Sequence, residues 1–467
     1  MSLILAIDFG STFTKAVVLD LEKEELVASA YVPSTVDTDI TVGLFSALEQ
    51  LRVRCHLNPL DIKHKLGCSS AAGGLRMVAI GLVRELTTKA AEEACLGAGA
   101  KLVGSFAYGL SELDMAKLEK LSPEIVLLCG GTDGGNKEVI VHNADMLAKS
   151  SIKSPIIIAG NRMAQQTIQA CLEKGGKECF ICENVLPELD RLEVEPAREL
   201  IRRVFMERIV HTKGFDKAQD LIGNIIMPTP RAVLKGCELI AQGTERQAGL
   251  GELVGIDVGG ATIDIYSVSA GHPTQPGVIV KGLPEPYIKR TVEGDIGIRY
   301  NAEHILERMG KDRIMDVISL LGGNFPVELN LETKISYMTK CVDCLPQNEH
   351  EFLLDSALAY IGVDVAMERH CGTISGMYTP MGEIRIQRGK DLTKINSIVA
   401  TGGIFTYGKK IEEILKGACA SENRVNSLRP INPEKFIIDR NYILFAIGLA
   451  AQIDPEKALR IMMKSLY

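Results

Sequence analysis

Two segments of the chain carry an aspartate at the end of an apolar strand, followed by a turn of small residues. The first reads ILAIDFGSTFTKAVVLD over residues 4–20, and the second reads LVGIDVGGATIDIYSVS over residues 253–269. Asp8 of the first segment aligns with Asp257 of the second. Each segment predicts a β-hairpin whose backbone amides can surround a phosphate group, because small residues let the main chain approach closely. Two such hairpins can hold a nucleotide from both sides.

The first hairpin offers a set of groups for phosphate and metal. Gly10 leaves room for the backbone to approach a phosphate, and Lys15 brings a positive charge to the β- or γ-phosphate. Amides and hydroxyls for the phosphate oxygens come from Ser11, Thr12 and Thr14. Asp8, at the end of its strand, is placed to hold a magnesium ion through water. An ordinary glycine-containing hairpin with surface hydroxyls would have the same composition, so this segment alone leaves both interpretations open.

The second hairpin repeats this arrangement. Asp257 supplies a second carboxylate for the metal, and the following small residues are Gly259, Gly260, Ala261 and Thr262. Asp264 is either a third acidic group near the metal or an exposed aspartate of the hairpin. The same motif is much less probable by chance in both halves of the chain than in one.

A third glycine-containing segment and two helices complete the set. The run SIVATGGIFTYGKKIEEIL predicts a strand that ends at Gly402 and Gly403, where a flat ring and a ribose can pack on the backbone near a helix N-terminus. Small residues also mark two predicted helices, PTPRAVLKGCELIAQG and RNYILFAIGLAAQI. They would let the helices cross closely at a hinge, although ordinary helix packing has the same pattern.

The composition is that of an α/β protein. The 467 residues predict roughly three domains, and 46% apolar residues with 44 glycines suit an aliphatic fold with many tight turns. A net charge of −7 with interspersed signs gives no basic surface for nucleic acid. The opening run LILAIDFG reads as a strand and not as a signal peptide. No apolar run approaches the ~18 residues that span a bilayer. We therefore expect a cytoplasmic protein without membrane contact.

The pattern of elements divides the chain. Strands alternate with helices over residues 60–190, which predicts an inserted block with a parallel, wound sheet. The flanking residues 1–59 and 191–250 would form a first lobe, and residues 251–467 a second one. The central stretch of the second lobe, residues 300–370, has apolar residues at helical spacing and no catalytic motif.

Twelve cysteines without a secretory signal predict reduced thiols. Two pairs have Cys-x-x-Cys spacing. Cys179 and Cys182 lie on a predicted strand, where residues three apart point to opposite faces and do not easily share a metal. Cys341 and Cys344 lie on a predicted loop, but a zinc or iron–sulfur site normally needs four ligands. Buried or incidental thiols are the favoured interpretation for both pairs.

The order of these elements resembles the actin-like ATPase superfamily, which includes sugar kinases, actin, heat-shock chaperone ATPases and activators of radical enzymes. The order is phosphate hairpin, small-residue helix, phosphate hairpin, adenosine-type glycine pair and small-residue helix. The resemblance implies duplicated ribonuclease H-like lobes, here with the inserted α/β block. It also implies ATP and Mg²⁺ as ligands.

Within that superfamily the chain resembles the glutamate mutase accessory protein family, often called MutL and unrelated to the mismatch-repair protein of that name. The resemblance rests on IDFGSTFTK, TVDTDI, CSSAAGGLRM, LLCGGTDGGNKEV, NVLPELDRLEVEPAREL, MPTPRAVLKG, VGIDVGGATIDIYSV, TVEGDIGIRYNA and VATGGIF. It implies a chaperone-like ATPase that reactivates an adenosylcobalamin-dependent glutamate mutase or a related aminomutase. The mutase subunits would be the protein's partners.

The resemblance also implies roles for single residues. Asp8 and Asp257 would position magnesium and the attacking water. The phosphates would be held by Lys15, Thr12 and Thr262, and adenosine would face Gly402 and Gly403. One departure is Met227, which stands where the related chaperones have a metal-positioning glutamate. Hydrolysis would then be slow, or would use Asp264 or Glu293 instead.

The loop GGTDGGN in the inserted block offers Asp133 and Asn136 as ligand contacts, but a glycine-rich turn with a helix cap is slightly favoured. We expect the block to contact the mutase, so its deletion would abolish that binding and keep ATP binding. Its pattern resembles a cobalamin-binding subunit, although the Asp-x-His-x-x-Gly motif is absent. Two other functions stay open: a small-molecule kinase of the same superfamily, and an iron–sulfur ATPase that activates a radical dehydratase.

Overall fold

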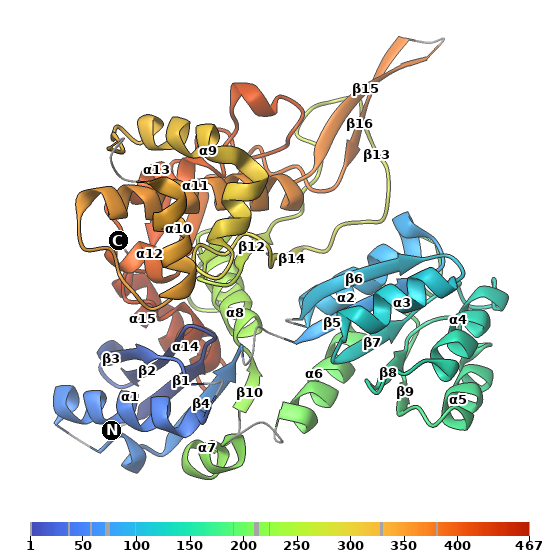
Figure 1. Ribbon diagram of the computed structural model, residues 1–467, viewed down its shortest axis with the longest axis horizontal. Helices are drawn as coiled ribbons and strands as arrows, with labels where there is room; N and C mark the ends of the chain where they lie inside the picture. Colours follow the sequence, from blue (N-terminus) through green and yellow to red (C-terminus); the bar gives the residue numbers. More distant parts are fainter. Residues whose placement is uncertain are drawn as a thin grey trace. The chain divides into compact units, whose positions relative to one another are not determined.

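The computed structural model describes residues 2–35, 38–56, 58–70, 75–98, 100–189, 191–209, 214–223, 225–326, 330–379 and 382–466 (Figure 1). Residues 36 and 37 of the TVDTDI segment and residues 71–74 of CSSAAGGLRM lie outside the described part. The chain divides into two compact units. Unit 1 comprises Met1–Ala72, Lys213–Lys281 and Glu285–Tyr467, and unit 2 comprises Gly73–Thr212 with Gly282–Pro284.

The first sheet of unit 1 contains the N-terminal hairpin. Its strand order is β10-β4-β1-β2-β3. Strand β1 pairs antiparallel with β2 and parallel with β4, and β4 pairs parallel with β10. The strands are β1 (Leu3–Phe9), β2 (Phe13–Asp20), β3 (Glu25–Pro33), β4 (His64–Ser69) and β10 (Ile225–Pro228). Helices α1 (Ile40–Cys55) and α7 (Phe215–Ile222) contact this sheet and each other.

The second sheet of unit 1 repeats this plan. Its strand order is β14-β12-β11-β17-β18. Strand β11 pairs antiparallel with β12 and parallel with β17, and β17 pairs parallel with β18, so direction and order match the first sheet. The strands are β11 (Leu253–Val258), β12 (Ile263–Val268), β14 (Ile288–Glu293), β17 (Ser397–Thr401) and β18 (Lys435–Ile438). The two repeated segments, residues 4–20 and 253–269, thus form equivalent hairpins in equivalent sheets.

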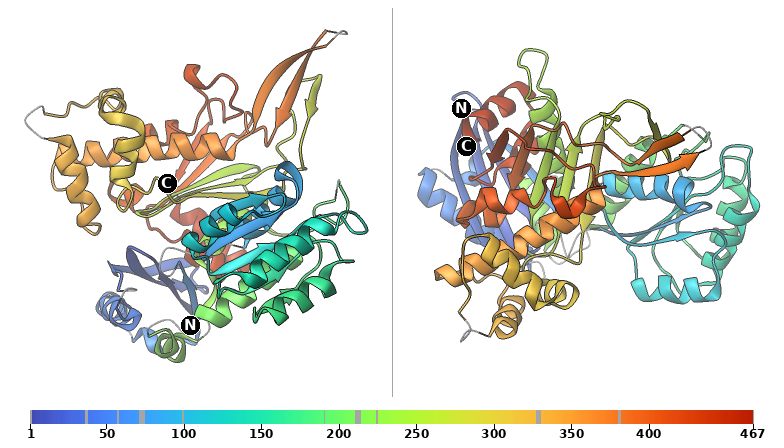
Figure 2. Two further views of the ribbon diagram at one scale, coloured as in Figure 1. Left: turned by 45° about the vertical axis from the view of Figure 1, so that its right-hand side comes forward. Right: turned by 90° about the horizontal axis from the view of Figure 1, so that it is seen from above.

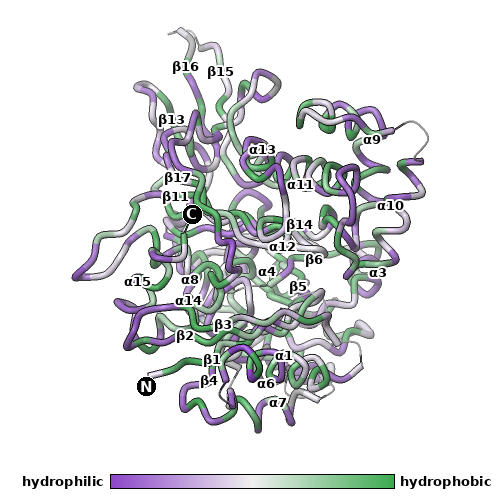
Figure 3. Tube along the Cα trace, turned by 90° about the vertical axis from the view of Figure 1, so that its left-hand side faces the viewer, coloured by the Kyte–Doolittle hydropathy of each residue, from purple (hydrophilic) through white to green (hydrophobic). Residues whose placement is uncertain are grey.

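Two helices pack between residues of both sheets. Helices α8 (Thr229–Gln242) and α14 (Leu444–Ala450) share one hydrophobic core with Ile4 of the first sheet and Val268 of the second. A Cβ added at Gly448 would lie 1.8 Å from the carbonyl oxygen of Ala232. The expectation that small residues let these helices cross closely is therefore confirmed. Figure 3 shows hydrophobic residues along β1 and α14, which belong to this core.

The remaining elements of unit 1 surround the second sheet. Helices α9, α10 and α11 share a second core with β11 and β12. Strands β15 and β16 form a hairpin that extends away from the second sheet and pairs with β13 (Figures 1 and 2). The elements are α9 (Ala302–Leu320), α10 (Leu331–Lys340), α11 (Glu349–His370), α12 (Gly403–Tyr407), α13 (Ile411–Lys416), α15 (Pro455–Ser465), β13 (Val278–Val280), β15 (Thr373–Thr379) and β16 (Gly382–Arg388).

Unit 2 is a wound sheet with the strand order β6-β5-β7-β8-β9, in which all pairs are parallel. This order is that of the flavodoxin-like α/β folds. The strands are β5 (Arg76–Gly81), β6 (Lys101–Ala107), β7 (Ile125–Leu128), β8 (Ile156–Ile158) and β9 (Cys179–Ile181). The helices are α2 (Lys89–Gly97), α3 (Glu112–Leu121), α4 (Glu138–Lys149), α5 (Gln165–Lys174) and α6 (Glu195–Ile209). The predicted parallel, wound sheet is confirmed.

The glycine-rich loop after β7 is a turn with a helix cap. Asn136 Oδ1 accepts a hydrogen bond from the amide of Val139 at 3.2 Å, which caps the start of α4. Asp133 Oδ1 accepts from the amide of Arg162 at 2.9 Å and from the side chain of Asn184 at 2.9 Å. Both candidate ligand residues are thus engaged in local structure, as the favoured interpretation of this segment expected.

The predicted α/β fold class is confirmed. The boundary between the first sheet and the inserted block lies after residue 60, the predicted start of the block. Strand β4, which the sequence pattern assigns to the inserted block, pairs with β1 of the first sheet. Residues 191–212 group with unit 2 and not with the first lobe. Among the described residues, no helix is both long and apolar enough to cross a membrane.

Candidate functional site

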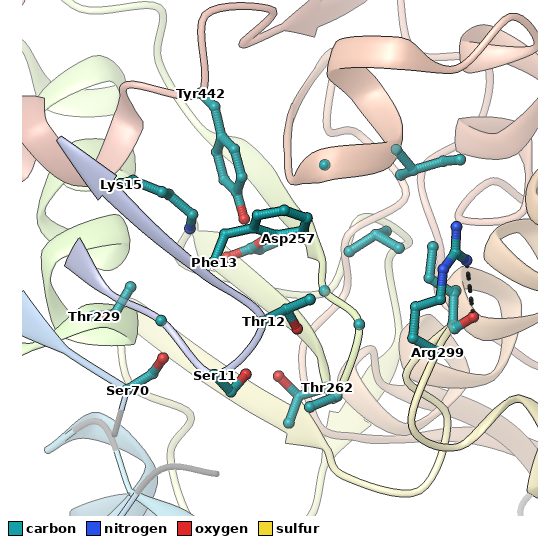
Figure 4. A pocket seen from close by; sticks show the side chains of 18 of the residues that line it. Ser11, Thr12, Phe13, Lys15, Ser70, Thr229, Asp257, Thr262, Arg299 and Tyr442 are labelled. Atoms are coloured by element: carbon teal, nitrogen blue, oxygen red, sulfur yellow. Dashed lines mark hydrogen bonds between the residues drawn. The ribbon is translucent and has the colours of Figure 1, made fainter. Parts of the chain in front are cut away.

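A cavity of unit 1 lies between the two equivalent hairpins (Figure 4). Its walls come from β1–β2, from β11–β12, from the start of α8 and from the segment before α14. Most of the residues singled out in the sequence line it: Asp8, Gly10, Ser11, Thr12, Lys15, Asp257, Gly259, Gly260, Ala261, Thr262, Asp264 and Gly403.

The two hairpins turn in the same way. The amide of Gly10 donates to the carbonyl of Phe13 at 3.1 Å, and the amide of Gly259 donates to the carbonyl of Thr262 at 2.9 Å. A Cβ at Gly10 would lie 2.5 Å from that Phe13 oxygen. The turn therefore requires glycine for space. The hairpins also approach each other, since a Cβ at Gly260 would lie 2.9 Å from the hydroxyl of Thr12.

The first hairpin buries an ion pair. Asp8 and Lys15 are directly opposite each other across β1 and β2, and Lys15 Nζ lies 2.8 Å from Asp8 Oδ2. The Asp8 side chain is fully buried and also accepts from the hydroxyl of Thr229, the first residue of α8. Lys15 Nζ stands 3.8 Å from the centre of the Tyr442 ring, a cation–π contact. Figure 4 shows Lys15 and Tyr442 facing each other.

These neighbours keep Lys15 charged. Burial alone would lower the pKa of Lys15, but the negative charge of Asp8, the Tyr442 oxygen and the charge of Asp257 hold that pKa well above its usual value. The cavity therefore contains a permanent cation with one side toward Asp8. An anionic ligand such as a phosphate group would share that charge.

Asp257 is the carboxylate with an unused oxygen. Within the described residues, its buried Oδ1 has no hydrogen-bond partner. Burial, and then the charge of Asp264, raise the pKa of Asp257 to about 7. An orphaned carboxylate oxygen costs free energy in the protein interior, so this atom favours an added cation.

Asp264 has a different environment. It stands opposite Asp257 in the β11–β12 pair, and its Oδ1 accepts from Nε of Arg290 at 2.7 Å. Its Oδ2 accepts from the hydroxyl of Thr262 at 3.1 Å. The Asp264 side chain is buried, so the prediction of an exposed hairpin aspartate is wrong. Arg290 neutralises the carboxylate that sequence reasoning had offered as a third metal group.

Three predicted residues do not line the cavity. Thr14 is buried on the opposite face of β2, where a Cβ at Gly43 would lie 2.9 Å from its hydroxyl. Gly402 lies against the end of β11 and has a φ of 120°. A Cβ added at Gly402 would lie 2.4 Å from the carbonyl oxygen of Val258. Glu293, at the end of β14, is in an ion pair with Arg369.

The cavity contains residues that sequence reasoning missed: Phe13, Ser70, Thr229, Pro230, Val258, Ile298, Arg299, Val342, Leu345, Ile404, Tyr407 and Tyr442. Several stand inside the quoted motifs, for example Thr229 in MPTPRAVLKG and Tyr442 in RNYILFAIG. Val342 and Leu345 adjoin the Cys341–Cys344 pair, whose spacing does not indicate that its neighbours line a cavity.

A buried network supports the second hairpin. Arg299 binds Asp355 through two nitrogens at 2.9 and 2.6 Å. The hydroxyl of Tyr407 donates to Asp355 at 3.0 Å. The backbone amide of Arg299 donates to the carbonyl of Gly260 at 2.9 Å. This network connects α11 and α12 to the turn of the hairpin.

The arrangement suits a phosphate chain with a divalent cation. Hard oxygen donors are the ligands that Mg²⁺ prefers, and Asp257 offers one that has no partner among the described residues. Asp8 is already bound to Lys15 and Thr229, so its oxygens would reach a metal through water. Asp257 and Asp8 therefore fit a Mg²⁺ ion.

Comparison with known proteins agrees with the motifs. The family model described as MutL protein matches residues 4–466 of this chain. Protein MutL of Clostridium tetanomorphum is 43% identical over 466 residues, which cover 100% of this chain and 99% of that relative. The chain therefore belongs to the MutL family, as its motifs predicted.

Proposed function

We propose that this protein binds Mg²⁺-ATP between its two hairpins and acts as an accessory, reactivating protein of an adenosylcobalamin-dependent glutamate mutase or a related aminomutase. The observation that carries the nucleotide part is the meeting of two equivalent hairpins, each with an aspartate, at one cavity that also contains Lys15. Membership in the MutL family supports the accessory part.

The duplicated plan of unit 1 supports assignment to the actin-like ATPase superfamily. Both five-stranded sheets have the same order and directions, and α8 and α14 pack in the core between them. Close crossing of two helices is suited to a small rotation of one sheet against the other. Such a rotation would change the width of the cavity when nucleotide binds or leaves.

The residues of the chain divide the work on the nucleotide. Lys15 neutralises phosphate charge, and the turns at Gly10 and Gly259 bring amides close to the phosphate oxygens. Asp257 Oδ1 would hold a magnesium ion, and Asp8 would contact the ion through water. Bound magnesium would withdraw charge from the phosphates and so favour attack by water.

Hydrolysis is proposed to be slow. Met227 is buried in the core cluster with α8 and does not line the cavity. The start of α8 therefore contributes the hydroxyl of Thr229 to Asp8, and no carboxylate that would position water. A slow ATPase is suited to a protein that changes shape around a client and not to one that turns over a metabolite.

The deciding experiment uses a glutamate mutase inactivated with damaged cobalamin. Addition of this protein with magnesium and ATP is expected to restore mutase activity, and the Asp257→Asn variant is not. Isothermal titration of the protein alone with ATP tests the nucleotide part separately. ATP binding without recovery of any candidate mutase, together with phosphorylation of a small metabolite, would instead support a kinase.

A further inference from the structure

The loop between α10 and α11 forms part of the cavity wall. Val342 and Leu345 line the same cavity as the two phosphate-type hairpins. Each of these residues directly follows a cysteine, Cys341 or Cys344, and the two cysteines are joined by a disulfide bond. The expectation of reduced thiols is therefore wrong for this pair, because the turn brings the two sulfur atoms together.

The disulfide fixes the turn that presents the apolar side chains. The amide of Cys344 donates to the carbonyl of Cys341 at 3.1 Å, and the amide of Cys341 donates to the last turn of α10 at Tyr337, at 2.9 Å. On the far side, the side chain of Gln347 donates to the carbonyl of Leu345 at 3.0 Å. Cutting the sulfur bond would leave the turn closed by single hydrogen bonds.

The pair is accessible to small thiols, unlike many other cysteines of the chain. Cys341 and Cys344 are half-buried, and Leu345 is 47% exposed. By contrast, Cys68, Cys95 and Cys237 are fully buried, and burial raises the pKa of each thiol. Thiol–disulfide exchange proceeds through thiolates with access to the solvent. Exchange is therefore favoured at the loop pair over these buried thiols.

We propose that Cys341 and Cys344 form a reversible dithiol–disulfide pair that controls the wall of the nucleotide cavity. This inference rests on the proposed function. In the oxidising direction one thiolate attacks a small-molecule disulfide and releases one thiol. The second cysteine then attacks the mixed disulfide, closes the Cys341–Cys344 bond and releases the second thiol, so electrons and protons balance. A small dithiol reverses both steps and is itself oxidised to a disulfide.

The oxidised form presents Val342 and Leu345 as a preformed apolar surface. The reduced form must order this turn when the nucleotide binds, and ordering costs affinity. We expect reduction to weaken ATP binding of the order of tenfold, the size typical of lost preorganisation in one short loop.

The test is isothermal titration of the full chain with Mg²⁺-ATP in buffers of oxidised and of reduced dithiothreitol. Alkylation followed by peptide mass spectrometry maps the thiols in each buffer. Wild type is expected to bind about tenfold more weakly when reduced. The Cys341→Ser/Cys344→Ser double variant is expected to bind like reduced wild type in both buffers. The matched control is Cys179→Ser/Cys182→Ser, the other pair with this spacing, which should behave like wild type.

Several outcomes would overturn the proposal. Equal ATP binding in both buffers removes the coupling and leaves the proposed function intact. Absence of ATP binding in both buffers removes the proposed function and the coupling together. Asp343 lies beside both sulfur atoms, with ligand atoms within 4.8 Å of one another. Stoichiometric Zn²⁺ uptake by the reduced protein that prevents reoxidation would therefore assign the pair to a metal instead.

Discussion

Lys15 and Asp264 occupy equivalent positions in the two hairpins of unit 1. Lys15 pairs across the strands with Asp8, and Asp264 pairs across the strands with Asp257. The first hairpin thus contains an ion pair, while the second contains two facing carboxylates, one of which is neutralised by Arg290. The two hairpins share one strand register, and the residue opposite the strand-end aspartate gives each hairpin its own charge. One copy is suited to phosphate and the other to a cation.

The first prediction separates the two carboxylates of the second hairpin. Asp257→Asn is expected to abolish the dependence of ATP affinity on Mg²⁺ and not to lower the free energy of unfolding, because Oδ1 has no partner among the described residues and the amide removes a buried charge. Asp264→Asn is expected to destabilise the protein by about 3–5 kcal/mol, because it removes the carboxylate of a buried ion pair. Titration calorimetry with and without Mg²⁺, and urea unfolding, measure the two effects. A large stability loss in Asp257→Asn would contradict the assignment.

The second prediction concerns the buried cation. Lys15→Met should weaken ATP binding by at least about tenfold, because the charge facing the phosphates is removed, and should leave adenosine binding unchanged. The comparison of ATP with adenosine isolates the phosphate contribution. Lys409→Met is the matched control, since Lys409 lies 4.6 Å from the centre of the Phe352 ring and does not line the cavity. Equal losses for ATP and adenosine would mean that the variant only distorts the site.

The hairpins show what could be predicted from the sequence. The repeated aspartate and small-residue turn are local features, and strand and turn chemistry follow from them directly. Thr14 shows where the reasoning stopped too early. It is the neighbour of Lys15 on β2, and alternation along a strand already implies that the two side chains point to opposite faces.

Other parts of the site depend on packing between distant segments. Val342 and Leu345 reach the cavity only because α10 and α11 pack on the second sheet, and no local pattern contains that information. The partner of Asp264 is Arg290 on β14. The two residues meet only because β14 pairs with β12, a pairing that no local pattern predicts. The segment around Cys341 and Cys344 predicts a loop, but the bond between their sulfur atoms depends on the turn that the folded chain forms there.

The third prediction tests the crossing of α8 and α14. Gly448→Ala places a methyl group 1.8 Å from the carbonyl oxygen of Ala232. The helices must separate to admit it, and the expected cost is at the upper end of the about 1–3 kcal/mol typical of overpacking. Gly403→Ala is the stability control, because its Cβ would make an ordinary contact with a Tyr407 ring carbon at 3.7 Å and no closer contact with the described side chains. Urea denaturation compares the two variants, and an unaffected Gly448→Ala would show that the helices do not cross as described.

The fourth prediction concerns acid stability and His370 at the end of α11. The imidazole is fully buried, with Nε2 at 2.8 Å from the Ser267 hydroxyl and Nδ1 at 2.9 Å from that of Thr291. Burial, followed by the charges of Lys289 and Lys390, lowers the pKa of His370 well below its usual value. The folded protein therefore keeps this ring neutral at pH values where the unfolded chain takes up a proton.

The sign follows from proton counting. Below the unfolded pKa of about 6.5, the unfolded state binds more protons, so this group's contribution to stability decreases as the pH decreases. The loss is at most about 1.4 kcal/mol per pH unit, or about 2 kcal/mol at pH near 5. His370→Gln should lose its hydrogen bonds at neutral pH but show a flatter stability curve below about pH 6.5. Chemical denaturation across this range measures the slopes, with the exposed His272→Gln as control. Parallel curves for wild type and His370→Gln would mean that another group causes the acid sensitivity.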